Sequence, residues 1–316
     1  MDKIFVCESP ENVKRVFASE EKVYNKADIL GGGFESVRYI FSTWGMPAFT
    51  EQELQTYLPS LEAVFYGAGT VQAFARPFLN RGIRVFSAWA ANAVPVAEYT
   101  VAQIILANKG FFGTMRYTDR GKANQQTKVF PGNYGVSVGI IGAGMIGKLV
   151  IGMLKAYNLD VLVFDPFLSD EKAEELGVQK VDLEMVFARC QVVSNHLANN
   201  AQTKGMLHGA LLASMMPYAT FINTGRGAQV VETDLIRVLR ERPDLTAILD
   251  VTDPEPPMAG SPLYELPNCI LTPHIAGSLG NEVRRMGKYM EEEFMCFLEK
   301  KPCKYDVTPA MLETMA

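Results

Sequence analysis

The sequence has few of the residues that build disulfide frameworks and metal centres. Its 316 residues include five scattered cysteines and no C-x-x-C pair: Cys7, Cys190, Cys269, Cys296 and Cys303. An odd, dispersed set of cysteines is typical of reduced thiols in a cytoplasm, and it argues against a disulfide framework or a zinc site. We therefore expect a cytoplasmic protein with no metal ion.

Other features are scarce as well. The 30 Lys and Arg residues do not exceed the 35 Asp and Glu residues, and a net charge of −5 argues against a nucleic-acid partner. No apolar run reaches the roughly 18 residues of a membrane span, so we expect no membrane association. An apolar run starts at Lys3, which leaves no room for a signal peptide.

Histidine is rare: the sequence contains only three, His196, His208 and His274. The search for a proton carrier is therefore short. What the chain does have is length and apolar content: 316 residues, 48% of them hydrophobic, are enough for about two domains, each with a packed core.

The most informative stretch is a glycine turn between two apolar runs. Residues 138–141 lead into Gly142-Ala143-Gly144-Met145-Ile146-Gly147, and a helix-forming run follows. In this G-x-G-x-x-G pattern Gly142 permits a tight turn, Gly144 lets the backbone approach a pyrophosphate, and Gly147 lets the helix pack on the strand. The N–H groups of the helix N-terminus would bind that pyrophosphate.

An acidic residue completes the pattern. Asp165 follows a second apolar run, residues 161–164, and stands 18 residues after Gly147. There it can hydrogen-bond a ribose 2′-hydroxyl and repel a 2′-phosphate. Since Pro166 and Phe167 follow it and no basic residue does, the pattern favours NAD over NADP. The alternative is a glycine-rich turn of an ordinary α/β protein, which the presence of both strands and the acid disfavours.

Residues 1 to about 90 have the pattern of a smaller α/β domain. Short apolar runs at 3–7, 38–42, 63–66 and 84–86 alternate with helix-like stretches, which predicts a parallel, doubly wound sheet. Gly67-Ala68-Gly69 follows the third run, where the exposed N–H groups could bind an anion or could belong to an ordinary turn. Residues 94–109 predict a buried helix, and residues 116–133 a surface connection.

After Asp165 three short segments follow predicted strands. In Ile222-Asn223-Thr224-Gly225-Arg226-Gly227, the guanidinium of Arg226 could grip a carboxylate through two parallel hydrogen bonds, or it could tie down loop carbonyls. Asp250 ends the next strand, and Glu255 stands in a proline-rich loop. In Thr272-Pro273-His274-Ile275-Ala276-Gly277, His274 suits a general acid/base, although a structural role is equally open.

Together these motifs resemble the NAD-dependent D-isomer-specific 2-hydroxyacid dehydrogenases. The motifs that carry the resemblance stand in the family's order: the glycine turn with Asp165, residues 194–198, residues 223–227, Asp250-Val251 with Glu255-Pro256, and residues 272–277. The resemblance implies an α/β fold of two doubly wound parallel-sheet domains with a cleft between them. A flavodoxin-like substrate domain would take residues 1–105 and 285–316, and a Rossmann NAD-binding domain residues 106–284.

The resemblance also implies roles for single residues. Arg226 would bind the substrate carboxylate and polarise the carbonyl, His274 would donate or accept the proton, and Glu255 would pair with His274. Asp250 would face the nicotinamide amide. The remaining cofactor positions would be Gly142, Gly144, Met145, Ile146, Gly147, Asp165, His196, Ala198 (where the family often has proline), Thr203, Thr224, Gly225, Ala276 and Gly277.

For the substrate, the resemblance assigns the carboxylate to the amides of Gly67, Ala68 and Gly69. Met46 or Trp44 could shape the pocket, or both could be core residues. The implied reaction is the NADH-dependent reduction of a small 2-oxo acid to its D-2-hydroxy acid by an oxidoreductase, commonly a homodimer. A phosphoglycerate substrate would need added basic groups and is disfavoured. The alternatives are a formate-type dehydrogenase of the same fold, which would have glutamine in place of Glu255, and a dinucleotide-sensing, corepressor-like binding protein.

Overall fold

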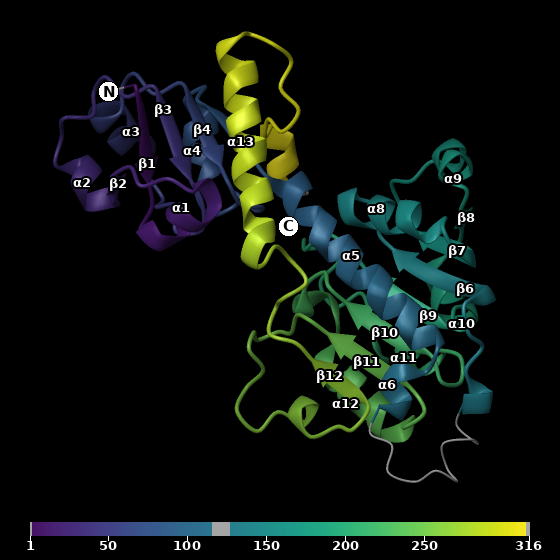
Figure 1. Cartoon of the computed structure of the whole chain (residues 1–316). Coiled ribbons are helices and arrows are strands. Elements are labelled where there is room, and N and C mark those ends of the chain that lie inside the picture. Colours follow the sequence, from purple (N-terminus) through teal and green to yellow (C-terminus); the bar gives the residue numbers. More distant parts are fainter. Residues whose placement is uncertain (1, 116–126, 314–316) are drawn as a thin grey trace. The chain divides into compact units, whose positions relative to one another are not determined.

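The computed structural model describes residues 2–115 and 127–313 (Figure 1). The chain divides into two compact units: unit 1 comprises residues 1–92 and 278–316, and unit 2 comprises residues 93–277. The boundaries drawn from the sequence, 105/106 and 284/285, fall inside the continuous helices α5 (Trp89–Asn108) and α13 (Val283–Leu298). Residues 116–126 of the expected surface connection lie outside the described residues.

Unit 1 is built on a five-stranded sheet in which every pair of neighbours is parallel. The strand order is β2-β1-β3-β4-β5, which is the flavodoxin-like order. The strands are β1 (Lys3–Val6), β2 (Val23–Tyr24), β3 (Tyr39–Ser42), β4 (Ala63–Tyr66) and β5 (Arg84–Ser87). Because all run the same way, the loops that follow them meet at one edge of the sheet.

Helices cover both faces of this sheet. They are α1 (Pro10–Phe17), α2 (Lys26–Leu30), α3 (Glu51–Tyr57), α4 (Ala75–Asn80) and α13, with 3₁₀ turns η4 (Gly280–Glu282) and η5 (Pro309–Glu313). Thr50 caps α3, because its side chain accepts a hydrogen bond from the Glu53 N–H. The helix α13 lies along α1 (Figure 1), so closely that a Cβ on Gly287 would be 2.2 Å from the Val16 carbonyl oxygen.

The core of unit 1 follows from the alternation of side chains along the strands. Aromatic residues point to the face that α13 covers, and Phe65 packs against Phe41, Phe86 and Phe294 with ring centroids 4.9–5.2 Å apart. The intervening residues, such as Ile40 and Val64, point to the other face and form a second buried cluster. The N- and C-terminal parts of the chain therefore share one core.

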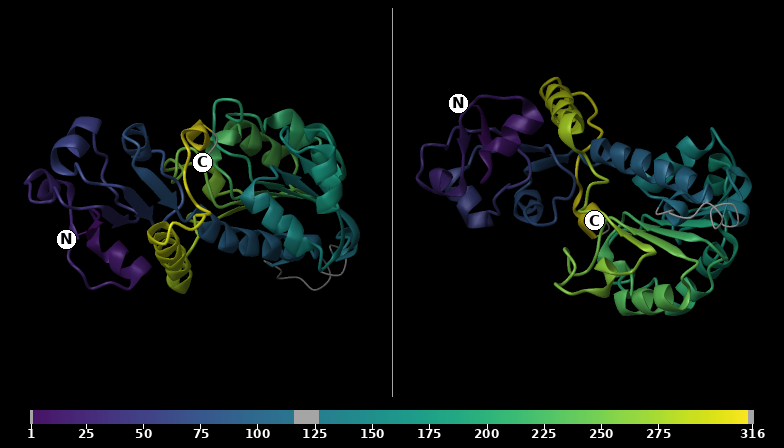
Figure 2. Two further views of the ribbon diagram at one scale, coloured as in Figure 1. Left: turned by 90° about the horizontal axis from the view of Figure 1, so that it is seen from above. Right: turned by 60° about the horizontal axis from the view of Figure 1, so that its bottom comes forward.

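Unit 2 is built on a seven-stranded sheet, also parallel throughout. The order is β12-β11-β10-β9-β6-β7-β8, which is the dinucleotide-binding order with one strand added at an edge. The strands are β6 (Tyr134–Ile141), β7 (Asn158–Phe164), β8 (Gln179–Lys180), β9 (Val192–Asn195), β10 (Thr220–Asn223), β11 (Thr246–Leu249) and β12 (Cys269–Leu271). Figure 2 shows this sheet in green and teal.

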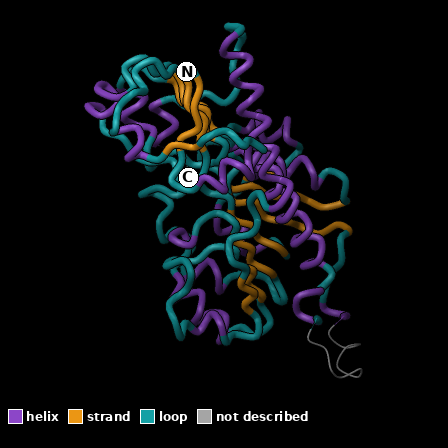
Figure 3. Tube along the Cα trace, turned by 60° about the vertical axis from the view of Figure 1, so that its left-hand side comes forward, coloured by secondary structure: helices purple, strands orange, loops and turns teal. Residues whose placement is uncertain are grey.

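Helices pack on both faces of this sheet too (Figures 2 and 3). They are α5, α6 (Phe111–Thr114), α8 (Met145–Leu154), α9 (Asp170–Leu176), α10 (Leu183–Arg189), α11 (Gly209–Ala213) and α12 (Glu232–Glu241), with 3₁₀ turns η1 (Thr127–Val129), η2 (Gly227–Gln229) and η3 (Pro262–Tyr264). Val193 and Phe221 belong to one buried cluster and Val192 and Ile222 to another, which shows that both faces are covered.

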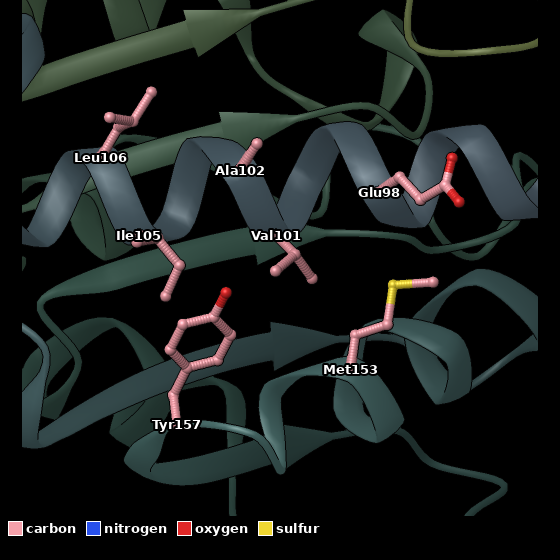
Figure 4. Close-up of a pocket in the computed structure, with 7 residues that line it drawn as sticks. All are labelled: Glu98, Val101, Ala102, Ile105, Leu106, Met153 and Tyr157. Carbon is pink, nitrogen blue, oxygen red and sulfur yellow. The ribbon is translucent and has the colours of Figure 1, made fainter.

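The longest apolar helix is α5. By length and hydropathy alone its 20 residues could cross a membrane, a criterion that a helix in a protein core also meets, and 44% of the window is buried. Ala97 and Ile104 of α5 pack into the core of unit 2. Next to these residues, α5 and the end of α8 form an open groove of about 420 Å³ (Figure 4), lined by Glu98, Val101, Ala102, Ile105, Leu106, Met153 and Tyr157.

Candidate active site

The glycine turn lies where the strand order reverses. The N–H of His196, directly after β9, donates to the carbonyl of Ile141 at the end of β6 over 2.7 Å. Gly142 has φ +92°, and a Cβ there would lie 2.9 Å from the carbonyl carbon of His196. Only glycine fits both demands. The carboxyl ends of β6 and β9 lie on either side of the point where the strand order reverses, which is where such sheets bind their ligands.

The start of α8 fits a pyrophosphate. A Cβ on Gly147 would lie 2.0 Å from the Gly142 carbonyl oxygen, so a side chain there would push the helix off the turn. A Cβ on Gly144 would meet no atom within 4 Å, and Met145 is 47% exposed. The start of α8 is thus open to a ligand, and its helix dipole favours an anion there.

Asp165 is held against this turn. One carboxylate oxygen accepts the Ala143 N–H and the other accepts the Phe167 N–H, both at 2.7 Å. A carboxylate has about four acceptor positions, so two remain for ribose hydroxyls. The residues present therefore fit the adenosine half of a dinucleotide.

The other predicted residues of unit 2 follow neighbouring strands at the same edge. Thr224 to Arg226 follow β10, Asp250 and Glu255 follow β11, and His274 to Gly277 follow β12. Five strand spacings separate β7 from β12, about 24 Å. The structure thus lines up the glycine turn, Arg226 and His274 along one edge.

His196 is buried and neutral. Its ring nitrogens lie 3.0 Å from the Ser194 hydroxyl and 3.3 Å from the Thr224 hydroxyl, so the side chain ties β9 to the turn after β10. Burial lowers the pKa of His196 to about 3. The ring therefore supports the site, and no proton transfer near neutral pH involves it. His208 is exposed.

This burial predicts a pH-dependent stability. In the unfolded chain His196 takes up a proton below about pH 6.5, whereas in the folded chain it stays neutral down to about pH 3. Its contribution is therefore complete above pH 6.5 and is lost as pH falls. We expect the free energy of unfolding by urea to drop about 2 kcal/mol more in the parent than in His196→Gln between pH 7 and pH 5. His208→Gln is the matched control, and equal pH slopes for all three proteins would contradict the assignment.

The loop after β9 holds the predicted positions Ala198 and Thr203. The Thr203 hydroxyl donates to the Ala198 carbonyl over 2.7 Å and accepts the Asn200 N–H. The side chain of Thr203 is therefore engaged in closing its own loop, and Ala198 is partly buried. Their contact with a cofactor remains a prediction.

Arg226 stands between two glycines that cannot be replaced. A Cβ on Gly227 would lie 1.9 Å from the carbonyl carbon of Thr252, and one on Gly225 would lie 2.8 Å from the side-chain oxygen of Gln229. The turn is thus pressed against the loop after β11. Burial lowers the pKa of the Arg226 guanidinium, and the charge of Glu255 opposes this shift. One nitrogen, Nη1, donates to the Gly225 carbonyl at 2.7 Å, which leaves the other N–H groups of the fork for a ligand.

His274 and Glu255 form an ion pair when the histidine is protonated. Nδ1 of His274 lies 2.6 Å from Oε1 of Glu255, and the two side chains are 49% and 40% exposed. The Nε2 atom is therefore the ring nitrogen left to meet a substrate. His274 has φ +54°, an uncommon value for a residue other than glycine, which the surrounding turn must enforce.

Asp250 enforces that turn. Its carboxylate accepts the Thr272 hydroxyl at 2.6 Å and the N–H groups of Ile275 and Ala276 at 2.8 and 2.9 Å, while its carbonyl accepts the His274 N–H. The Tyr99 hydroxyl lies 3.1 Å from that of Thr272. Asp250 is only 2% exposed. Its hydrogen bonds hold the His274 turn, and the expected contact with the nicotinamide amide stays a prediction.

In unit 1, Gly67, Ala68 and Gly69 follow β4. Their carbonyls accept hydrogen bonds from both neighbouring strands: the Thr43 hydroxyl, after β3, donates to the Gly67 carbonyl over 3.0 Å, and the Ser87 hydroxyl, on β5, shares its proton between the carbonyls of Ala68, at 2.9 Å, and Gly69. These contacts fix the course of the turn. The expected binding of a carboxylate by its N–H groups stays a prediction.

Gly67 also has a packing role. A Cβ there would lie 2.7 Å from the Val16 side chain of α1. Met46 and Trp44, after β3, are partly buried and pack against the core of unit 1. A contact of either side chain with the substrate stays a prediction.

The chain is similar to known proteins over more than half of its length. Residues 101–276, more than half of the chain, match the NAD binding domain of the D-isomer specific 2-hydroxyacid dehydrogenases. The chain belongs to this family. Among curated relatives, D-3-phosphoglycerate dehydrogenase of Archaeoglobus fulgidus is 30% identical over 234 residues, which are 74% of this chain but 44% of that protein. The chain thus spans less than half the length of the curated relatives it matches.

Solved structures of the 2-hydroxyacid dehydrogenase family share the whole fold. A phosphoglycerate oxidoreductase from Rhizobium etli superposes with a TM-score of 0.79 at 22% identity, covering 98% of this chain and 99% of that one. The NAD-complexed D-isomer specific 2-hydroxyacid dehydrogenase of Lactobacillus delbrueckii ssp. bulgaricus gives 0.77 at 20% identity, covering 98% and 100%. The expected α/β fold with two parallel sheets is confirmed.

Several residues that build this candidate site have no assigned role in the sequence prediction. Tyr99 and Thr272 belong to the contacts around Asp250, and the amides Asn195 and Gln229 lie beneath the Arg226 turn. A signal exists for the amides: Asn195 ends an apolar run, and Gln229 stands between Ala228 and Val230. A polar residue in such surroundings is buried only with partners.

Proposed function

We propose that this protein is an NAD-dependent D-2-hydroxyacid dehydrogenase that reduces a small 2-oxo acid. The observation that carries the proposal is the 2.6 Å contact between His274, on the turn after β12, and Glu255, in the loop after β11, with Arg226 on the turn after the neighbouring strand β10. An acid/base held by a carboxylate, beside an arginine with free donors, is the pair that a 2-oxo acid needs: a proton for the carbonyl oxygen and a clamp for the carboxylate.

The residues of this chain would divide the work as follows. Arg226 binds the substrate carboxylate through its planar fork and stabilises the negative charge that develops on the carbonyl oxygen. His274, protonated, gives the proton on Nε2 to that oxygen and keeps the Nδ1 proton directed at Glu255. The N–H groups of residues 68–70 add hydrogen bonds to the carboxylate. Bound NADH supplies the hydride.

We propose an unphosphorylated substrate. Residues 43–50 and 67–74, which include the turns after β3 and β4, contain no lysine or arginine. Lys26, whose Nζ reaches the Ala48 carbonyl over 2.7 Å, is already paired with Glu53 at 2.9 Å. A phosphate would need a cation there, so the names of the phosphoglycerate relatives do not carry over.

One assay tests the proposal. NADH oxidation is followed with a panel of 2-oxo acids that includes glyoxylate, pyruvate, hydroxypyruvate, longer aliphatic acids and phosphohydroxypyruvate, and the configuration of each product is determined. We expect turnover with an unphosphorylated acid and a D product. NADH binding without turnover of any acid would instead support a dinucleotide-sensing protein, and turnover of formate with NAD a formate-type enzyme.

The same assay tests the cofactor. Since the Asp165 carboxylate would lie against the adenosine ribose, a 2′-phosphate would meet a like charge. We expect kcat/KM for NADH to exceed that for NADPH by about 100-fold, and Asp165→Ser to reduce this ratio at least tenfold. Asp160→Ser, a change of the same kind near the start of β7, is the control and should leave the ratio unchanged. Equal use of both cofactors by the parent would rule the assignment out.

A further inference from the structure

Three buried amide side chains meet beneath the Arg226 turn. Asn195 ends β9, Asn223 ends β10 and Gln229 ends the 3₁₀ turn η2; none of the three is more than 1% exposed. Burying an amide is costly unless its hydrogen bonds are made. The question is therefore what these three amides bind.

They bind one another in a single arrangement. Asn195 Nδ2 donates to Asn223 Oδ1 over 3.0 Å and to Gln229 Oε1 over 2.6 Å. Asn195 Oδ1 accepts the Leu197 N–H, and Gln229 Nε2 donates to the Leu197 carbonyl over 2.8 Å. Because every oxygen meets donors and every NH₂ group meets an acceptor, no amide can be rotated by 180° without losing hydrogen bonds.

The network also binds both backbone groups of Arg226. The Arg226 N–H donates to Gln229 Oε1 over 3.1 Å, and the Arg226 carbonyl accepts Asn223 Nδ2 over 3.1 Å. The preceding residue is held as well, since the Gly225 N–H donates to Asn223 Oδ1. The Arg226 backbone is thus attached to β9 through two amides and not only to its own strand.

The turn is in van der Waals contact with the same amides. A Cβ on Gly225 would lie 2.8 Å from Gln229 Oε1 and 2.9 Å from Asn195 Nδ2. A movement of either amide would therefore displace the turn. Apolar side chains could fill this space without the desolvation cost of three amides, but they would leave the Arg226 N–H unbound and the turn free to shift.

We propose that Asn195 and Gln229 are positioning residues that set the place and direction of the Arg226 guanidinium. The inference rests on the proposed function, in which Arg226 grips the substrate carboxylate. Misplacement of a positioned group by a fraction of an ångström lowers transition-state binding. The amides then act on the substrate only through Arg226.

The test is a double-mutant cycle. Gln229→Met keeps the length of the side chain and removes its polar atoms; it is made in the parent and in Arg226→Lys. The matched control is Gln191→Met, which alters another buried glutamine, at the opposite end of β9, whose Nε2 donates to the Pro217 carbonyl. We measure kcat/KM and KM for the best 2-oxo acid, the Kd of NADH, and the Kd of oxamate, an unreactive analogue, in the presence of NADH.

We expect Gln229→Met to lower kcat/KM about tenfold in the parent, through a raised KM and a weaker oxamate complex, and less than about twofold in Arg226→Lys. The Kd of NADH should stay within about twofold, and Gln191→Met should match the parent. An equal loss in both backgrounds, or a loss no larger than that of Gln191→Met, would overturn the inference.

Two provisions keep the test decisive. Should Gln229→Met fail to fold, Asn195→Ala, which leaves Gln229 bound to the Arg226 N–H, is put through the same cycle with the same criteria and a smaller expected loss. Should the parent reduce no 2-oxo acid, the proposed function fails, and the oxamate Kd alone decides whether Gln229 acts through Arg226. No oxamate binding by the parent would overturn the inference as well.

Discussion

Replacing His274 with asparagine is expected to lower kcat for 2-oxo acid reduction by about 10²- to 10⁴-fold, the usual contribution of a positioned general acid. Asparagine keeps a hydrogen-bonding group at the turn, but its amide is neither an acid nor a base near neutral pH. The turn itself should survive, because Asp250 holds it through the backbone of Ile275 and Ala276 and through Thr272. The Kd of NADH should therefore stay near that of the parent.

His208→Asn is the control, since it changes an exposed histidine on another turn. Its activity should equal that of the parent. A His274→Asn variant with more than about a tenth of the parental kcat would mean that the proton comes from elsewhere, and a large loss of NADH affinity would mean that the substitution disturbed the fold.

The companion change, Glu255→Gln, tests the pairing. The Glu255 carboxylate lies 2.6 Å from Nδ1 of His274 and carries the charge that pairs with a protonated imidazole, whereas the amide of glutamine carries no charge. We expect kcat for reduction to fall about tenfold in Glu255→Gln, which corresponds to about 1.4 kcal/mol, with the Kd of NADH unchanged. An unchanged kcat would show that Glu255 does not act through His274.

The second large effect is expected from Arg226→Lys. Lysine keeps the positive charge but cannot offer two parallel donors, and its shorter reach from a turn fixed by Gly225 and Gly227 cannot be made up by moving the backbone. We expect kcat/KM to fall about 100-fold for every 2-oxo acid, about 2.7 kcal/mol of transition-state binding. NADH affinity should change little.

Arg237→Lys provides the control, because Arg237 is an exposed arginine on α12 that pairs with Glu241 at 3.1 Å. It should leave all constants unchanged. Turnover by Arg226→Lys within about threefold of the parent, well under 1.4 kcal/mol, would show that Arg226 is not the carboxylate clamp.

The sequence predicts this site well where a single segment carries the signal. The glycine turn is recognised from three glycines within six residues. The turns around Arg226 and His274 each follow an apolar run directly, so one short segment predicts both the strand and the functional side chain at its end. The strand runs at 63–66 and 84–86 are found for the same reason. Two-residue strands such as β2 and β8 cannot be predicted in this way, because they lack a longer apolar run and are defined only by their pairing with a neighbouring strand.

Contacts between side chains on different turns could not be predicted from the sequence. The three donors on Asp250 come from residues 22 to 26 positions away, and Asn195 meets Gln229 across 34 positions. Which side chains meet across neighbouring turns depends on strand order and register. The sequence indicates the parallel class of the sheet but not the register, so it can place Asp250 at the edge without revealing what its carboxylate binds.

The sharing of unit 1 between both ends of the chain affects how the protein is made. Unit 2 is continuous, and a ribosome has delivered all of it once residue 277 has emerged. Unit 1 still lacks α13, which covers its aromatic face, and Val307, whose N–H donates to Val85 on the edge strand β5. At about 5–20 residues per second that interval lasts about 2–6 s. A finished nucleotide-binding unit thus coexists in the nascent chain with an uncovered aromatic face and an open strand edge, the two surfaces that chaperones recognise and that start aggregation.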